Sequence, residues 1–402
     1  MSGKRGTLPA GSVREVFAVF LGLGLTSFGG PIAHLGYYRR QLVERRGWLD
    51  DDQYAQVVAL AQFLPGPASS QVGFSLGLMR AGWAGALAAF VAFSLPSAVL
   101  MFAFAAVLPA LSGPLAAAAL NGLKLVALAV VAHGVVGMAR RLCPDAQRIA
   151  IAVAVTVAVL LAASVQLQLA AIALAALAGL VVCRHLAPVA ATDLPLPHGP
   201  RTGFLLVGVF ALLLVSLPWL AANGTLSAAA AAFYRAGALV FGGGHVVLPL
   251  LQQGVVQPGW IAADEFLAGY GAAQAVPGPL FTLAAFLGAR LPGADGGLFG
   301  GLVALGAIFL PGFLLMAGTL PLWRRLARHP SATRAVAGVN AAVVGLLAAA
   351  LYDPLWVTAV RGLADFAVAL AGFGLLLSAR VPVLAVVAFC VLASMARAGL
   401  SG

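Results

Sequence analysis

The segment Gln62–Ser70 reads QFLPGPASS, which places a Pro-Gly-Pro triplet inside an otherwise apolar stretch. The segment Gln274–Thr282 reads QAVPGPLFT and repeats this arrangement in the second part of the chain. Proline removes a backbone donor and clashes with the preceding helical turn, so both segments predict an interrupted helix. An interrupted helix inside a bilayer must be surrounded by protein or water, because open backbone groups in hydrocarbon cost several kcal/mol each.

The composition predicts a membrane protein. Of the 402 residues, 62% are hydrophobic and 9% are charged, whereas soluble proteins carry about 25% charged residues. Uncharged stretches such as 149–167 and 203–226 approach the roughly 20 residues that cross a bilayer core. We expect no removable signal peptide after the basic start at residues 4–14. The predicted location is a bacterial-type inner membrane, with many crossings and a cytoplasmic N-terminus.

The two interruptions belong to a longer internal duplication. Its matched pairs are Phe28-Gly29-Gly30-Pro31 with Phe241-Gly242-Gly243-Gly244, Gly47-Trp48-Leu49 with Gly259-Trp260-Ile261, the two Pro-Gly-Pro triplets, Phe93–Ser97 with Ile308–Gly312, and Gly122 with Gly338. So many matches in one order, at nearly constant spacing, predict two homologous halves. We expect a first repeat at 1–184, a cytoplasmic linker with a connecting transmembrane helix at 185–224, and a second, inverted repeat at 225–402.

Loop charges predict that the halves are inserted in opposite orientations. The basic loop 39–46 has an uncharged counterpart at 252–258, whereas the uncharged loop 109–120 has a counterpart that contains Arg324, Arg325, Arg328 and Arg334. Short basic loops stay in the cytoplasm, so one half must be upside down relative to the other. The predicted fold is therefore an all-α polytopic membrane protein, an inverted repeat with broken or re-entrant helices.

The number of crossings depends on the broken segments. Unbroken crossings are predicted at 82–108, 116–138, 149–164, 167–183, 203–221, 297–318, 335–351, 363–378 and 381–396. The four broken segments are 14–38, 53–80, 226–251 and 265–289. We favour re-entrant hairpins, which give nine crossings. Broken full crossings would give thirteen and would place the loop 39–46 outside, against the charge rule.

The interruptions predict an anion site. A half-helix that begins after a break points free N–H groups and about half a positive charge into the surrounding cavity, which suits an anion. The alternative is a set of simple packing kinks. The candidate substrate-binding residues are Gly29, Gly30, Gln62, Pro65, Gly66, Pro67, Ser69, Ser70, Lys124, Gly242, Gly243, Gly244, His245, Gln274, Pro277, Gly278, Pro279, Thr282 and Asn340.

Two of these residues are ionisable. Lys124 lies in an apolar span and no acid is an obvious partner, so an anionic substrate would fill that role. The alternative is that Lys124 snorkels to the nearby surface. Asn340, its repeat counterpart, would supply a neutral donor. His245 would titrate in a proton-coupled step or serve as a structural, hydrogen-bonded histidine.

Other features indicate no chemistry of their own. The cysteines Cys143, Cys183 and Cys390 lack metal or redox spacing, so we predict no catalytic residues, cofactor or metal. The acids after each Gly-Trp pair, at 50–52 and 264–265, resemble helix caps and first-turn acids. Arg80 and Arg290 would line access routes or act as interfacial side chains. We attribute the net charge of +11 to cytoplasmic loops and a preference for anions, not to nucleic acid.

The paired motifs resemble those of the chromate transporter (CHR) superfamily, long-chain two-domain type. They are Phe28-Gly29-Gly30-Pro31, Gly47-Trp48-Leu49, Leu64-Pro65-Gly66-Pro67, Phe241-Gly242-Gly243-Gly244-His245 and Val276-Pro277-Gly278-Pro279. The resemblance implies efflux of chromate and chromate resistance, driven by the proton-motive force, with sulfate as a competitor. Pro31 and Ile32 stand where the second half has Gly244 and His245, which confines any histidine role to one half.

Three functions remain as hypotheses at this point. The first is a secondary transporter, an antiporter of chromate or another tetrahedral oxyanion such as sulfate, in which one half rocks against the other. The second is a cation or neutral-solute carrier, for which the apolar spans offer few acids. The third is a membrane enzyme, for which the sequence contains no nucleophile–base pair or phosphate loop. Protons are the expected coupling ion, and a homodimer is one alternative for the oligomeric state.

Overall fold

The computed structural model describes residues 11–162, 165–186, 194, 196–241, 244–326, 328–378 and 380–400. Their regular secondary structure is entirely helical. Six helices in these ranges are long and apolar enough to cross a membrane: Ala68–Ala110, Pro114–Leu142, Pro200–Leu220, Gly297–Leu322, Pro330–Ala359 and Val383–Leu400. The predicted ranges 149–164, 167–183 and 363–378 fall on shorter apolar helices, so their crossing of the membrane stays a prediction.

The described residues of the first half form seven α-helices. They are α1 (Val13–Thr26), α2 (Gly30–Tyr38), which continues as a π-helical segment (Arg39–Glu44), α3 (Asp51–Phe63), α4 (Ala68–Val107), α5 (Pro114–Leu142), α6 (Ala146–Leu161) and α7 (Val165–Val182). The backbone of α4 leaves the helical region at Ala81 and Gly82, which divides it in two. Asp50 caps α3 in a reciprocal capping box with Gln53, as its acidic start predicts.

The connecting helix and the second half follow in the same order. The connecting helix is α8 (Pro200–Leu220). The second half comprises α9 (Thr225–Leu239), α10 (Val247–Leu251), α11 (Ala263–Ala275), α12 (Leu283–Ala289), α13 (Gly297–Thr319), α14 (Trp323–Leu326), α15 (Pro330–Ala350), α16 (Val357–Ala359), α17 (Leu363–Leu377) and α18 (Val383–Leu400). Asp264 and Glu265 lie in the first turn of α11, whose N-cap is Ala262.

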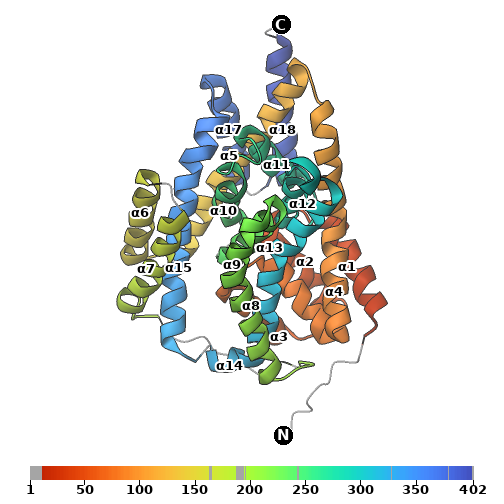
Figure 1. Cartoon of the computed structure of the whole chain (residues 1–402), viewed down its shortest axis with the longest axis vertical. Helices are drawn as coiled ribbons and strands as arrows, with labels where there is room; N and C mark the ends of the chain where they lie inside the picture. Colours follow the sequence, from red (N-terminus) through yellow and green to blue (C-terminus); the bar gives the residue numbers. More distant parts are fainter. Residues whose placement is uncertain are drawn as a thin grey trace.

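Matched glycines reproduce the duplication in three dimensions. Gly24 of α1 lies against the Phe93 carbonyl of α4 and leaves no room for a side chain, and Gly237 of α9 lies in the same way against Ile308 of α13. Gly77 likewise lies against the carbonyl of Gly85, and its counterpart Gly288 lies against the carbonyl of Gly300. Equivalent helices reach opposite ends of the molecule, since α4 rises towards the end that carries the C-terminus whereas α13 descends to α14 (Figure 1).

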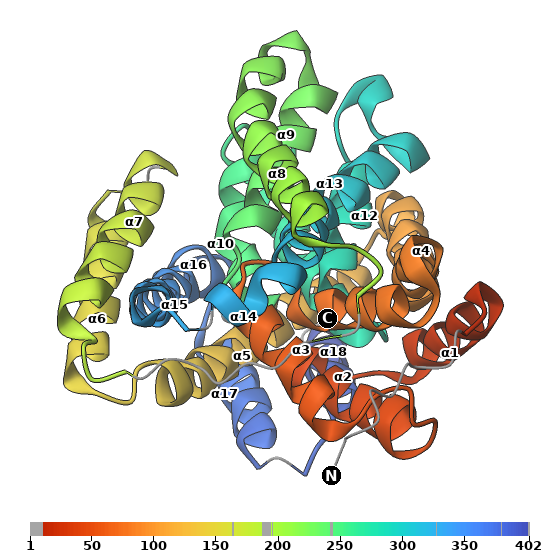
Figure 2. The ribbon, with the colours of Figure 1, turned by 90° about the horizontal axis from the view of Figure 1, so that it is seen from below.

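The last two helices of each half pack against the other half. The helices α17 and α18 pack on α5, whereas α6 and α7 pack on α15 (Figure 2). The predicted pair Gly122 and Gly338 lies at these contacts, because Gly122 meets Val391 of α18 and Gly338 meets Ala175 of α7. The two homologous halves are therefore interlocked, and neither is a separate globular body.

The four broken segments are present as helix–break–helix units. The first pieces, α1, α3, α9 and α11, have 14, 13, 15 and 13 residues. At 1.5 Å per residue these pieces are about 20 Å long, shorter than a bilayer core of about 30 Å. Re-entry thus stays our prediction for these segments.

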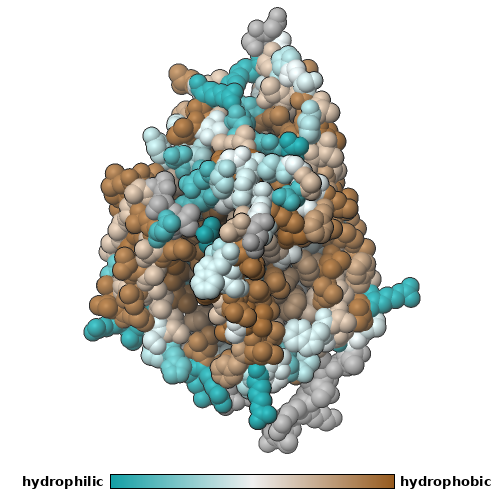
Figure 3. Space-filling model, viewed as in Figure 1, coloured by the Kyte–Doolittle hydropathy of each residue, from teal (hydrophilic) through white to brown (hydrophobic). Residues whose placement is uncertain are grey.

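The surface carries a broad apolar zone. In Figure 3, hydrophobic residues cover the middle of the visible face, whereas hydrophilic residues gather towards its two ends. Exposed large side chains of this kind include Leu174 of α7, Phe204 and Leu212 of α8, and Leu370 of α17. A contiguous apolar surface of this extent suits a lipid environment.

Candidate functional site

The breaks of the two halves are joined by a reciprocal pair of backbone hydrogen bonds. Gly66 of the first Pro-Gly-Pro triplet donates its N–H to the carbonyl of Val240, with a distance of 2.6 Å. Gly278 of the second triplet donates to the carbonyl of Ser27, at 2.8 Å. Ser27 and Val240 are the repeat counterparts that end α1 and α9. Each half therefore satisfies a carbonyl at the first break of the other half, which joins the four interruptions in two pairs.

Both triplets also pack on the proline-containing helix of the opposite half. A side chain at Gly66 would come within 3.0 Å of the Cα atom of Gly312, which follows Pro311 in α13. A side chain at Gly278 would come within 3.0 Å of Ser97 Oγ, which follows Pro96 in α4. The φ angles of +128° and +94° are readily adopted only by glycine. Both glycines are thus needed for conformation and for close approach.

His34, which is not among the predicted site residues, lies at the same centre. Its side chain is 1% exposed. Nε2 lies 3.2 Å from the Ser27 carbonyl, and Nδ1 lies 3.2 Å from Ser69 Oγ. A carbonyl only accepts, so Nε2 carries the proton, and in the neutral ring Nδ1 accepts from the Ser69 hydroxyl. His34 therefore engages the hydroxyl of Ser69, which we expected to face a substrate.

Gln71 is a second residue that is not among the predicted site residues. It is fully buried, and its Nε2 donates to the carbonyls of Pro65 at 2.8 Å and Gly312 at 3.0 Å. This amide links the first triplet to α13 of the other half. A lone glutamine directly after Ser69-Ser70 in an apolar stretch was the available signal, but its partner is distant in the sequence.

Several predicted ligands use their polar groups elsewhere. Thr282 donates its hydroxyl to the Pro279 carbonyl at 2.8 Å, because its backbone turns into a 3₁₀ segment there. Gln62 accepts from Arg141 at the end of α5, so it faces that helix and not the break. Their polar groups are thus engaged within the protein in this structure, and the role of the two side chains in anion binding stays a prediction. Ser70 differs, since its Oγ is buried without a hydrogen-bond partner among the described residues.

The second half contributes a further polar group. His245, beside the third break, lies with Nδ1 2.8 Å from the Tyr270 hydroxyl of α11, which agrees with a structural, hydrogen-bonded histidine. Gln274 Nε2 and Asn340 Oδ1 are buried, and neither has a hydrogen-bond partner in the described part of the chain. Gly242 and Gly243 lie outside the described residues.

The first breaks of the two halves also approach each other. A side chain at Gly244 would contact Pro31 at 3.6 Å. Gly29 and Gly30, with φ angles of +97° and +77°, form the turn into α2. The prolines Pro65, Pro67, Pro277 and Pro279 flank the two hydrogen-bonded glycines in the other breaks. The predicted backbone elements thus converge, although the side chains around them differ between the halves.

Lys124 corrects a sequence expectation. Its side chain is 7% exposed, and its Nζ lies 2.6 Å from Asp264 Oδ1 at the start of α11. Arg361 lies 3.4 Å from the other oxygen of this carboxylate. The expectation that Lys124 lacks an acidic partner is wrong, because α11 packs along α5 and brings its first-turn acid to the lysine.

Arg80 and Arg290 also have acidic partners. Arg80 lies 3.0 Å from Glu15 of α1, and Arg290 pairs with Glu265 of α11. Arg80 holds the end of its broken segment to α1, whereas Arg290 holds the end of its segment to the first helix of that same segment. The structure therefore favours an interfacial role for them and gives no support for side chains that line an access route.

The core around the breaks is poor in acids. Asp365 is the one carboxylate whose side chain is buried among the described residues, and it is paired with Arg397 at 2.6 Å and with Asn121. No group of three or more His, Cys, Asp or Glu residues suitable for a metal occurs in the described ranges. Backbone donors, amides and hydroxyls therefore dominate the centre.

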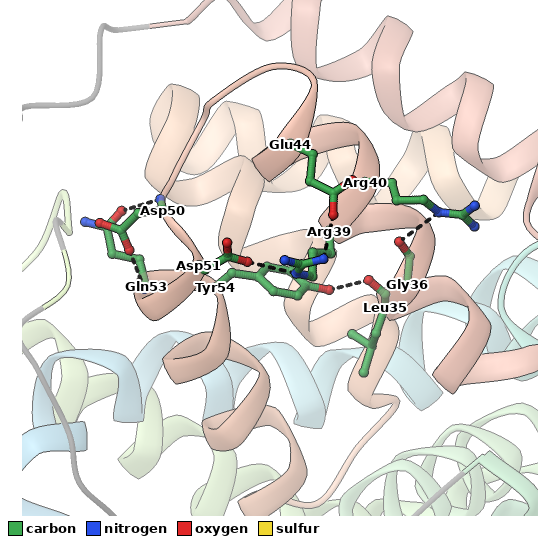
Figure 4. Close-up of polar contacts among 9 residues, drawn as sticks. All are labelled: Leu35, Gly36, Arg39, Arg40, Glu44, Asp50, Asp51, Gln53 and Tyr54. Atoms are coloured by element: carbon green, nitrogen blue, oxygen red, sulfur yellow. Dashed lines mark hydrogen bonds and ion pairs between the residues drawn. The ribbon is translucent and has the colours of Figure 1, made fainter.

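An open surface groove lies beside the first break. It lies between α1 and α2, has a volume of about 530 Å³, and extends from Arg45 and Arg46 to Gly22 and Thr26, which precedes Ser27. Arg40 also lines it. Figure 4 shows Arg39 between Glu44 and Asp51, whereas the guanidinium of Arg40 points away from that cluster.

Comparison with known proteins agrees with the duplicated arrangement. The family described as Chromate transporter matches residues 14–180 and again residues 227–395. A chromate transport protein of Cupriavidus metallidurans is 29% identical over 92% of this chain and 88% of its own length. A chromate transport protein of Pseudomonas aeruginosa is 29% identical over 90% of this chain and 87% of its own length. No solved structure matches the chain. Two matched segments that cover most of the sequence show that the chain belongs to the chromate transporter family.

Proposed function

We propose that this protein is a secondary transporter that exports chromate, or a related tetrahedral oxyanion, across the inner membrane and so confers chromate resistance. The observation that carries the proposal is the reciprocal pair of hydrogen bonds from Gly66 to Val240 and from Gly278 to Ser27. These bonds join four helix interruptions from two homologous halves in two pairs. Named relatives that transport chromate support the choice of substrate.

The chemistry of the centre favours an anion. The helices α2 and α4 begin at breaks, and their free N–H groups carry partial positive charge. Ser70 holds a buried hydroxyl without a partner among the described residues. A cation would need acceptors, and the one buried carboxylate in the described chain, Asp365, is already paired with Arg397. A cation or neutral-solute carrier is therefore the weaker alternative.

Chromate and sulfate present the same charge and shape to such a site. Backbone N–H groups and a hydroxyl recognise oxygen acceptors and do not read the central atom. Sulfate and other tetrahedral oxyanions thus remain the alternative substrates, and a direct comparison of transport rates must separate them.

We further propose that the halves are inverted in the membrane, with boundaries at 1–184, 185–224 and 225–402 and a cytoplasmic N-terminus. The opposite directions of α4 and α13 support this orientation (Figure 1). So do the basic residues at 39–46 and 324–334, because the repeat counterparts of these stretches, at 252–258 and 109–120, contain no Lys or Arg. An inverted pair suits alternating access around a central site.

An asymmetry between the halves supports rocking. The helix α11 packs along α5, with Gly271 directly on the Leu123 carbonyl. The repeat counterpart of this contact, α3 on α15, is not comparably formed within the described residues. A structure in which the α5–α11 contact is closed and the equivalent α3–α15 contact is open is expected for one end state of a transport cycle.

The test is transport by purified protein in lipid vesicles. Chromate, sulfate and molybdate should be compared with and without a pH gradient, and cells that express the protein should accumulate less chromate. We expect chromate flux that responds to the proton gradient. Flux of chromate no faster than through protein-free vesicles, under either condition, would contradict the proposal.

A further inference from the structure

Two cavities of this protein are lined by repeat-equivalent residues. When Phe28 is aligned with Phe241, the first cavity contributes Gly22, Leu23, Thr26, Tyr37 and Arg40. Their counterparts Arg235, Ala236, Leu239, Leu250 and Gln253 all line a second cavity, between α9 and α10. The same structural groove therefore occurs once in each half.

The two grooves differ in how open they are. The first has a volume of about 530 Å³, whereas the second has about 10 Å³, which is room for about one water molecule. The second is covered by Gln168, Leu169 and Ile172 of α7, which belongs to the first half. The covering helix thus comes from the first half of the sequence, although it packs on α15 of the second half.

Each groove places an arginine at one of two matched positions. In the first groove these positions hold Gly22 and Arg40, and in the second they hold Arg235 and Gln253. In the first half the arginine follows the break, at Arg40, whereas in the second half it precedes the break, at Arg235 of α9. A guanidinium is therefore present in both grooves although neither arginine has an arginine as its repeat counterpart.

Arg235 has the surroundings of a binding group. Among the described residues it has no carboxylate within ion-pair distance, and its cavity neighbours Gln168 and Gln253 are 4% and 8% exposed. Gln168 Oε1 is buried and has no hydrogen-bond partner in the described part of the chain. A guanidinium inside a membrane protein is costly and generally has a partner or a function. The five guanidinium N–H groups and the NH2 groups of the two amides can donate to an oxyanion, whereas the unpartnered Gln168 Oε1 is an acceptor and suits the guanidinium of Arg235.

We propose that Arg235, Gln168 and Gln253 form a binding site for a small tetrahedral oxyanion, with Arg40 as the equivalent group in the open groove. The anion occupies this site when α7 separates from α9 and α10, since the present volume admits no such ligand. The inference rests on the proposed function for the class of anion, and it adds a site in the groove, apart from the central breaks.

The experiment measures anion binding to the purified full-length protein in detergent. The thermal unfolding midpoint is followed as chromate, molybdate or sulfate is added, for the wild type and for Arg235→Gln, Gln168→Glu and the exposed control Arg328→Gln. We expect Arg235→Gln to weaken the apparent affinity about tenfold or more, as for loss of a charge-assisted contact. Arg328→Gln should bind as the wild type does.

The variant Gln168→Glu separates loss of anion binding from loss of folding. It supplies a carboxylate to Arg235, so the anion-free protein should unfold at the same temperature as the wild type or higher, whereas the anion should no longer bind in the groove and only the shift in unfolding temperature that comes from the central breaks should remain. Wild-type affinity in both Arg235→Gln and Gln168→Glu would overturn the site and leave the proposed function intact. If the wild type binds none of the three anions, both the groove site and the proposed function are overturned. If Arg235→Gln folds and binds the anions with wild-type affinity, that result alone rejects a role for Arg235 in anion binding.

Discussion

At the scale of single residues, Gly66 and Gly278 carry the contact between the two halves. Each has a positive φ angle, donates its N–H across the halves, and lies against the proline-containing helix opposite. Gly113 offers a matched control, because its φ angle is +89° but nothing lies within 4 Å of the position a side chain would take.

We expect Gly66→Ala and Gly278→Ala to abolish transport and to lower stability more than Gly113→Ala does. Alanine at such φ angles costs about 1–3 kcal/mol, which all three variants incur, whereas only the first two also push α13 or α4 away. Thermal unfolding and vesicle flux are the measurements. Equal behaviour of the three variants would show that close approach at the breaks is unimportant.

Residue-level prediction succeeded where a local rule applies and failed where a partner is distant. The Pro-Gly-Pro triplets and the capping role of Asp50 follow from nearby residues alone. His34, Gln71 and the Asp264 partner of Lys124 were missed because their contacts join residues far apart in the sequence. No periodic pattern marks a single polar residue in an apolar stretch, so its environment emerges only from the packing.

At the scale of elements, the contact between α5 and α11 depends on more than apolar packing. Lys124 and Asp264 join the two helices, and Asp264 remains about half exposed. An ion pair of this exposure contributes up to about 1 kcal/mol to stability. Its larger effect should be on the relative position of the two helices, since α11 leads into the second Pro-Gly-Pro break.

We expect the charge exchange Lys124→Glu with Asp264→Lys to recover the transport that each single change reduces. Recovery follows if Lys124 acts through its ion pair, because either order of charges joins the helices. The measurement is initial chromate flux in vesicles for the two single variants and the exchanged protein. Arg361 also contacts Asp264, so the exchange is repeated with Arg361→Gln to remove repulsion from the introduced lysine. Failure of this protein too, with normal folding, would instead assign Lys124 to direct anion binding.

At the scale of the whole molecule, the sequence predicted the duplication and the order of helices because matched motifs and hydropathy repeat along the chain. It could not predict that α6 and α7 leave their own half to pack on α15, or that α17 and α18 pack on α5. Hydropathy identifies apolar helices but carries no information on which neighbour covers them. Gly122 and Gly338 were recognised as a pair, yet their partners Val391 and Ala175 required the structure.

The exchange of terminal helices gives the interlocked halves a means of moving together. Since α7 covers the groove of the second half and packs on α15, a movement of α7 away from α9 and α10 would uncover it. The corresponding groove of the first half is open. The grooves, the α5–α11 contact and the central breaks therefore belong to one proposed motion.

The central claim is that breaks from two oppositely oriented halves meet and offer backbone donors to an oxyanion. An electron cryomicroscopy structure of the protein in lipid nanodiscs with saturating chromate tests it most directly. We predict halves that face opposite sides of the lipid, the Gly66–Val240 and Gly278–Ser27 contacts at mid-depth, and anion density within hydrogen-bond distance of the breaks. Halves that face the same side, or breaks that lie against lipid without anion density, would contradict the account.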